Sequence, residues 1–293
     1  MEWYWLAIAS ALLSAFSAIM QKKVLGKISA LNFTVIVSVI IALLSTILVG
    51  KVDLSSAGSF TIPVLIGKSI INAAAFLCIM TALKNLEISR ALPILAASPM
   101  TVALLAFIFL GESLSLTEVM GMLLIVSGTY ILELKKSENI SAPFRVFIDS
   151  KYHRIILIAL GLMTLSAILD KLLLTSFKLP PLTFLVLQNY FFLIIFLLFR
   201  IFNGFRNKNE KLFSGVSKEI LLIIIFIAIA TIGYRWTQIE ATRLGPVGLV
   251  IAIKRLSVLF AVVIGAKLFN EENYLKKVIA TITIVAGALL IYD

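Results

Sequence analysis

Long apolar runs alternate with short polar or charged connections along the whole chain. Ten such runs can be marked, each about 20 residues long. A run of this length can cross the hydrocarbon core of a bilayer, and in lipid it must be helical, because every backbone N–H and C=O needs an internal partner. The pattern therefore predicts an all-α integral membrane protein with ten transmembrane helices, at residues 3–21, 30–50, 62–83, 89–110, 115–134, 154–175, 182–202, 219–241, 245–268 and 273–292.

Polar and small residues recur at matched positions in the two halves of the chain. Residues 17–22 match residues 166–171, and further along Ala82, Glu112 and Gly128 match Ala241, Glu271 and Gly287. We therefore expect two copies of a five-helix unit, residues 1–136 and 154–293, joined by a connecting loop at 137–153. An odd number of spans per copy makes the second copy inverted, an architecture of secondary transporters whose substrate site lies near the midplane.

Composition agrees with a membrane protein and excludes several other classes. Hydrophobic residues make up 61% of the chain and the mean hydropathy is +1.08, against roughly 45–50% apolar residues in soluble domains. The net charge of +11 does not indicate nucleic-acid binding, because the basic residues gather in the connections. The single histidine, His153, falls in a predicted connection, so no histidine metal site is expected. No motif for a nucleotide or another cofactor is present.

The distribution of lysine and arginine predicts the orientation in a cell membrane. Most basic residues lie in the odd-numbered connections and their flanks, whereas the even-numbered ones hold little beyond Lys51, Lys171, Lys178 and Arg243. The positive-inside rule places the odd connections in the cytoplasm. Both termini are then expected outside the cytoplasm, and the first run is interpreted as a retained span of a multi-pass protein.

Four cations lie well inside predicted spans, where a charge costs from about 2.5 to more than 10 kcal/mol. They are Lys68, Arg235 and the adjacent pair Lys254 and Arg255. Few carboxylates are available to neutralise them, although pairs such as Arg235 with Asp170 or Glu240 are an alternative explanation. The excess positive charge favours a binding site for an anion.

Helical spacing groups these cations with other polar residues. Residues three or four apart share one face of a helix, which joins Lys68 to Asn72, Arg235 to Gln238, and Lys254 to Ser257. Gln188 and Asn189 could contact substrate or hold helices together, Trp236 is placed near the cavity, and Asp170 is a candidate for carrying a coupling proton. The predicted substrate-binding set is Lys254, Arg255, Arg235, Lys68, Asn72, Gln238, Gln188, Asn189, Trp236 and Ser257.

The repeat and its motifs resemble the EamA half of the drug/metabolite transporter superfamily. The resemblance rests on Ala82, Ser98-Pro99 and Gly111-Glu112 in the first copy, and on Ala241, Gly245-Pro246 and Asn270-Glu271 in the second. It implies a ten-helix transporter over essentially the whole chain. The Lys254-Arg255 pair is similar to the pair that binds phosphate in plastid triose-phosphate translocators, which implies an anion-binding role for these two residues. The first copy has Leu95-Ala96 at the matching positions.

These features predict a secondary transporter, not an enzyme, that moves a small anionic or zwitterionic metabolite, including phosphorylated ones, by alternating access. One alternative is an exporter of amino acids or amphipathic metabolites. Another is an integral-membrane enzyme that uses Lys254 as a base or Schiff-base residue. The expected partners are the solute and membrane lipid, and the sequence leaves open whether the protein is a monomer or a homodimer.

Overall fold

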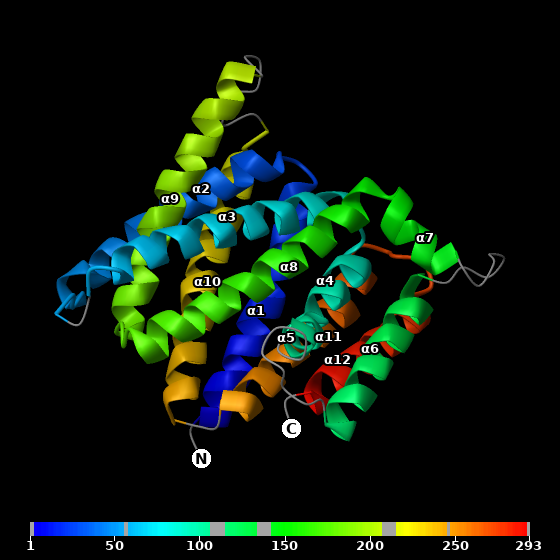
Figure 1. Ribbon diagram of the computed structural model, residues 1–293. Coiled ribbons are helices and arrows are strands. Elements are labelled where there is room, and N and C mark those ends of the chain that lie inside the picture. The colour runs from blue at the N-terminus through cyan, green and yellow to red at the C-terminus, as the bar shows by residue number, and fades with distance from the viewer. Residues whose placement is uncertain are drawn as a thin grey trace.

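The computed structural model describes residues 3–55, 58–105, 115–133, 142–206, 215–244 and 247–291. In this part of the chain every regular element is helical (Figure 1). The first half holds α1 (Trp3–Leu25), α2 (Ala30–Ser45), η1 (Thr46–Lys51), α3 (Thr61–Asn85), α4 (Ile88–Ala96), α5 (Ser98–Leu105) and α6 (Leu116–Glu133). The second holds α7 (Ala142–Asp149), α8 (Lys151–Lys171), the π-helical turn η3 (Leu172–Ser176), α9 (Pro181–Arg206), α10 (Lys218–Leu244), α11 (Val247–Leu268) and α12 (Tyr274–Leu290).

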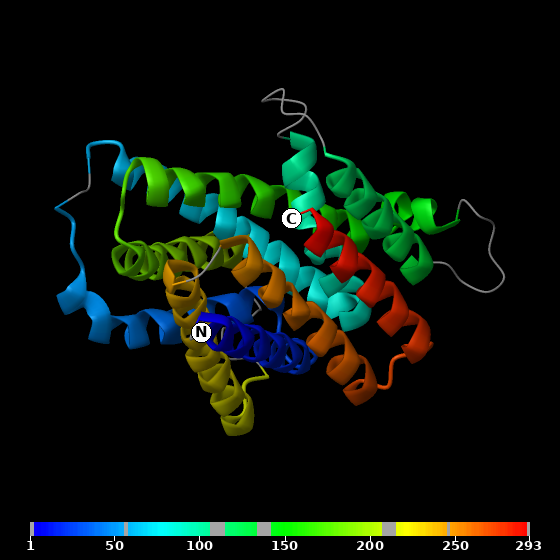
Figure 2. The same cartoon turned by 90° about the horizontal axis from the view of Figure 1, so that it is seen from below.

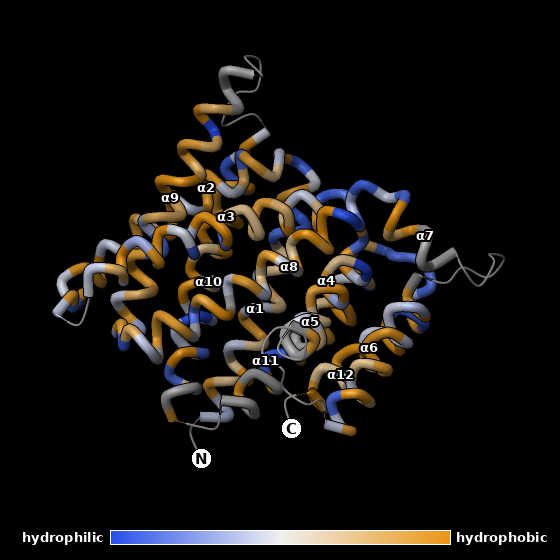
Figure 3. Tube along the Cα trace, in the orientation of Figure 1, coloured by the Kyte–Doolittle hydropathy of each residue, from blue (hydrophilic) through white to orange (hydrophobic). Residues whose placement is uncertain are grey.

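Six of these helices are long and apolar enough to cross a membrane. They cover Trp3–Leu25, Ala30–Lys51, Thr61–Asn85, Lys151–Leu174, Pro181–Phe202 and Lys218–Ala241. Apolar residues run along the lengths of the helices and hydrophilic ones gather toward their ends (Figure 3). Large side chains such as Trp5, Ile47 and Phe226 remain exposed on the outside. An outer surface of this kind requires lipid, so the chain is a multi-pass membrane protein.

The helices pack in pairs that bring distant parts of the chain together. α1 packs against α10 and α11, α3 against α8, and α2 against α9. α6 lies beside α12 at one edge of the molecule, as both views show (Figures 1 and 2). The main apolar core lies among α1, α2, α3, α4, α8 and α10.

Close approach of α6 and α12 depends on glycine. A Cβ added to Gly287 would lie 2.5 Å from the carbonyl oxygen of Gly121, and one added to Gly121 would lie 2.6 Å from that of Gly287. Gly128 approaches the backbone of Ala280 in the same way. The two backbones are therefore in direct contact, as in other membrane helices with small residues at the interface.

The fourth apolar run is interrupted rather than forming one helix. α4 ends at Ala96 and α5 begins at Ser98, with Ala97 between them. Pro93 lies inside α4 and Pro99 in the first turn of α5. Because proline lacks a backbone N–H, each weakens helix continuity over this stretch. The prediction of a single helix over 89–110 is thus wrong at Ala97, and residues 106–110 lie outside the described residues.

The connecting loop contains more regular structure than expected. α7 covers Ala142–Asp149, and α8 begins at Lys151 with Ser150 as its N-cap. His153 therefore lies in the first turn of α8, not in a loop. Its side chain is buried, its Nδ1 lies 2.8 Å from Ser150 Oγ, and its ring packs edge-on against Phe147.

A charged cluster joins the turn between α3 and α4 to the turn between α11 and α12. Glu271 accepts hydrogen bonds from the Ile88 backbone N–H (2.8 Å) and from Ser89 Oγ, so it caps the N-terminus of α4. Lys277 Nζ lies 2.9 Å from Glu87 Oε1 and 3.6 Å from Glu271 Oε2. Lys22 donates to the Leu83 carbonyl at the end of α3 (2.7 Å). Glu112, the counterpart of Glu271 in the predicted repeat, lies outside the described residues.

Candidate functional site

A small cavity with both polar and apolar lining lies between α2, α3, α9 and α10. Its volume is about 80 Å³. The polar side chains lining it are Ser38, Asn72, Asn189, Thr231, Tyr234 and Arg235, and the aromatic ones are Phe76, Phe192 and Phe196. Arg235 brings a positive charge to this lining. It lies four residues after Thr231 and therefore on the same face of α10. Two predicted site residues, Asn72 and Asn189, line the cavity together with it.

Arg235 and α9 are joined by an amide contact. Arg235 Nη1 donates to Gln188 Oε1 at 3.4 Å, and Gln188 is buried. Asn189 donates from Nδ2 to Ser45 Oγ at 2.9 Å, which ties α9 to the end of α2. Gln188 thus contacts the cavity arginine, whereas Asn189 also serves to hold two helices together.

Lys68 forms an ion pair that differs from the one considered from the sequence. Its Nζ lies 2.7 Å from Asp170 Oδ1, and 4.6 Å from the centre of the Phe184 ring. Lys68 is 1% exposed, whereas Asp170 is 38% exposed. The carboxylate expected beside Arg235 is therefore paired with Lys68. This choice of partner follows from the packing of α3 on α8.

The adjacent cations on α11 reach different helices. Lys254 donates to Gln238 Oε1 of α10, and its Nζ lies 5.3 Å from the centre of the Tyr234 ring. Arg255 Nη2 donates to Ser98 Oγ at 2.7 Å, directly at the break between α4 and α5. Neighbouring residues point about 100° apart on a helix, which explains the separate partners. Lys254 thus faces the ring of Tyr234, which lines the cavity, and Arg255 contacts the interrupted helix.

These cations share one electrostatic environment. Arg235 lies close enough to repel both Lys68 and Lys254, and Arg255 also repels Lys254. Asp170 neutralises Lys68, whereas the contacts described above for Arg235, Lys254 and Arg255 are to neutral amide, hydroxyl and aromatic groups. The region can therefore hold additional negative charge.

Trp236 and Ser257 neither line the cavity nor take part in the contacts of the cations described above. Trp236 is 41% exposed and does not line the cavity, although its neighbour Arg235 does. Its placement near the cavity is wrong, because one residue step turns the side chain toward the outer surface. Ser257 is half-buried on α11, three residues after Lys254, and it does not line the cavity either.

Sequence reasoning missed two residues that contact the cations. Tyr234 provides both a cavity wall and the ring facing Lys254, and Ser98 accepts from Arg255. Tyr234 precedes Gln238 by four residues and so shares its helical face. This spacing could have predicted Tyr234 as a site residue from the sequence. The Ser98-Pro99 step marked a helix break, but nothing in the sequence joined it to Arg255. Among the described residues, no group of three His, Cys, Asp or Glu side chains could hold a metal ion.

Together, the apolar helices and the charged side chains between them define a polytopic membrane protein with cations in its interior. The profile of the EamA-like transporter family matches residues 1–134 and 152–293. Because these two stretches make up most of the chain, the protein belongs to the EamA-like transporter family. Members of this family move small solutes across membranes and are not enzymes.

Comparison with solved structures agrees on the fold. One structure, titled "Crystal structure of protein", is similar over 96% of this chain and 96% of its own, with a TM-score of 0.61 and 15% sequence identity. At that identity the likeness concerns the fold alone. No curated protein matches the chain.

Proposed function

We propose that this protein is a secondary transporter of small anionic or zwitterionic metabolites, including phosphorylated ones, that works by alternating access. The observation that carries the proposal is the group formed by Arg235, Lys254 and Arg255 inside apolar helices: all three contact neutral partners, and Arg235 lines the cavity. Uncompensated charge is costly at this depth. An anionic solute would offset it, with arginine binding an oxyanion bidentately and lysine as a compact charge.

The proposed architecture is ten spans in two inverted five-helix repeats, with α4 and α5 together forming the fourth span. The family profile matches two separate stretches of the chain, residues 1–134 and 152–293, and this duplication supports the repeat. The helix pairing gives further support. In the two repeats α1 corresponds to α8, α2 to α9, α3 to α10 and α6 to α12. Exchanging the repeats therefore turns the α1–α10 contact into the α8–α3 contact and leaves the α2–α9 and α6–α12 contacts as they are. All four contacts occur.

The size of the cavity bears on the mechanism. A volume of about 80 Å³ is well below the roughly 300–1,000 Å³ of typical small-molecule sites. A metabolite larger than a simple anion would enter only if α2, α3, α9 and α10 separate. We infer that the structure corresponds to a contracted state of the transport cycle, and that rocking of helix groups opens the site to each side in turn.

The interrupted helix beside Arg255 supports a role for the Lys254-Arg255 pair in substrate binding. Discontinuous helices form the substrate sites of many transporters, because their ends expose backbone groups inside the membrane. Here the break at Ala97 lies next to Ser98, the partner of Arg255. The resemblance of the pair to the triose-phosphate translocator branch points to a phosphate or carboxylate group as its ligand.

Asp170 is proposed as the coupling residue. It is the partner of a buried lysine and is itself partly exposed, so a proton can reach it. Protonation would remove the negative charge that holds the Lys68 ammonium. Lys68 would then add to the positive charge near Arg235 and favour anion binding. Uptake of the solute would thus be linked to uptake of a proton.

Aromatic side chains in the cavity favour a second candidate within transport. Phe76, Phe192 and Phe196 line the cavity together with the polar groups. An amino acid or amphipathic metabolite with a carboxylate and an apolar portion would find a partner for each portion. Such a solute would be exported rather than imported.

A thermal-shift screen of the purified protein tests the proposed substrate class. Phosphorylated metabolites, carboxylates and amino acids are compared with neutral sugars and cationic amines. A true ligand at 100 times its Kd raises the free energy of unfolding by about 2.7 kcal/mol. We expect such stabilisation from at least one anionic or zwitterionic compound, followed by saturable uptake of it into proteoliposomes. Stabilisation by cations or neutral sugars alone would contradict the proposal.

The proposed orientation places both termini outside the cytoplasm. It rests on the excess of lysine and arginine in the odd-numbered connections. A reporter that folds only after export, fused behind the last residue and expressed in bacteria, is expected to be active. A cytoplasmic reporter at the same position should be silent, and the opposite result would reverse the assignment of the two sides.

A further inference from the structure

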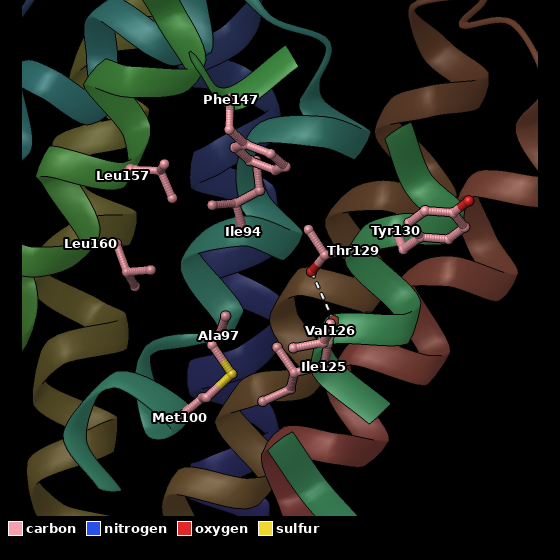
Figure 4. A pocket seen from close by; sticks show the side chains of 10 residues that line it. All are labelled: Ile94, Ala97, Met100, Ile125, Val126, Thr129, Tyr130, Phe147, Leu157 and Leu160. Atoms are coloured by element: carbon pink, nitrogen blue, oxygen red, sulfur yellow. Dashed lines mark hydrogen bonds between the residues drawn. The ribbon is translucent and has the colours of Figure 1, made fainter. Parts of the chain in front are cut away.

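An apolar groove lies apart from the charged cavity, between α6 and α8. Its volume is about 230 Å³, and its floor is formed by α4 and α5. Figure 4 shows side chains from each wall facing it, including Ile94, Met100, Val126, Phe147 and Leu157. A dry apolar cavity of about 150 Å³ is already large enough to bind benzene. The groove therefore has room for several methylene groups of a longer chain.

The groove is accessible from the lipid-facing surface. Val126 of α6 and Leu157 of α8 line it, yet they are 46% and 41% exposed. α6 packs mainly against α12, and α8 packs mainly against α3, so the two groove walls belong to different helix pairs. A hydrocarbon chain in the surrounding bilayer can enter between them without crossing a polar barrier.

Two arginines lie beyond one end of the groove. Arg154 is exposed and precedes the lining residue Leu157 by three positions on α8. Arg90 precedes Ile94 by four positions on α4 and pairs with Glu87 at 2.7 Å. Residues at these spacings share a helical face. Both residues therefore lie on the groove side of their helices, one turn closer to the helix start.

The same end of the groove is covered by α7. Phe147 of α7 lines the groove and stacks edge-on against His153, the neighbour of Arg154. Ile148, the next residue of α7, is 69% exposed. A short helix with an exposed apolar residue beside basic side chains is suited to the membrane–water boundary. The arginine end of the groove is thus the end at the level of lipid headgroups.

We propose that this groove binds one acyl chain of an anionic phospholipid, whose phosphate contacts Arg154 and Arg90. The apolar walls suit hydrocarbon, and the cations at the boundary suit a negative headgroup. A soluble anion would leave the apolar walls unused. A transmembrane helix of a partner protein would be blocked by α7, which covers the end of the groove. Lipid bound here bridges α6 to α8, so it should also stabilise the folded protein.

The test uses purified full-length protein in detergent, titrated with phosphatidylglycerol or phosphatidylcholine, with bound lipid counted by native mass spectrometry. We expect preferential binding of one phosphatidylglycerol and a higher unfolding temperature in its presence. Arg154→Gln should weaken that binding about fivefold, the effect of one cation near an anionic headgroup. Lys218→Gln, which removes an exposed cation at the start of α10, is the matched control and should leave binding unchanged.

A second pair of variants tests the groove itself. Leu157→Trp fills the groove and should abolish the bound phosphatidylglycerol. Ile158→Trp adds the same side chain to the neighbouring exposed position and should have no effect. Equal binding of phosphatidylglycerol and phosphatidylcholine would overturn the proposal. So would equal binding of phosphatidylglycerol by the two tryptophan variants, provided that their unfolding temperatures in lipid-free detergent are unchanged. Neither result would bear on solute binding at Arg235, which lines a different cavity.

Discussion

Replacement of Arg235 by glutamine is expected to weaken binding of the anionic solute by at least about 30-fold. Arg235 lines the cavity, donates to the buried Gln188 and repels both Lys68 and Lys254. Loss of one partner in a buried charge-assisted contact typically costs 2–5 kcal/mol or more, and 2 kcal/mol corresponds to about 30-fold in affinity. The affinity is measured by ligand titration of purified variants.

Companion variants separate charge from geometry. Arg235→Lys keeps the charge but loses the planar fork, so it should restore binding only in part. Lys254→Ala and Arg255→Ala should each weaken binding by a similar factor if the pair contacts the solute. Lys218→Gln, at the exposed start of the same helix as Arg235, serves as the control. Unchanged affinity in Arg235→Gln and in both alanine variants would exclude the anion site.

The second large effect concerns the Lys68–Asp170 pair. Asp170→Leu would leave the Lys68 ammonium buried beside Phe184 without its carboxylate. Removal of one partner from a fully buried pair costs 3–5 kcal/mol. We expect about 2–3 kcal/mol here, because Asp170 is 38% exposed and water screens the pair. Unfolding in detergent or lipid nanodiscs measures the loss.

The double variant Lys68→Met/Asp170→Leu should recover most of the lost stability, since it removes both charges from apolar surroundings. If Asp170 carries the coupling proton, this folded double variant should still bind the solute, but its uptake should no longer respond to a proton gradient. Full proton-driven uptake by the double variant would rule out Asp170 as the coupling residue. Failure of the double variant to regain stability would show that the pair itself is not the source of the loss.

The sequence predicted the helical membrane fold and its family because both depend on properties of single segments. Apolar length alone identifies a spanning helix, and motif order identifies the family. The interruption at Ala97 was missed, although Pro93 and Pro99 on either side of it weaken helix continuity. For His153, the serine three residues earlier is a recognised N-cap signal, and it would have extended the helix to include this residue.

Within the candidate site, the type of residue was easier to predict than its partner. Arg235 and Asn72 stand out as polar groups in apolar runs, and both line the cavity. That Asp170 pairs with Lys68 depends on how α3 meets α8, which no local pattern encodes. Trp236 was misplaced because adjacent positions on a helix face different surroundings.

The cap of α4 by Glu271 has a consequence for biogenesis. The Ile88 amide and the carboxylate that accepts its hydrogen bond are separated by 183 residues. At roughly 5–20 residues per second, the ribosome needs roughly 10–40 s to synthesise the intervening chain. During that interval the start of α4 sits in the membrane without its final partner. Insertion of the helices and their final packing must therefore be separate events, and a chaperone or the translocon has time to act between them.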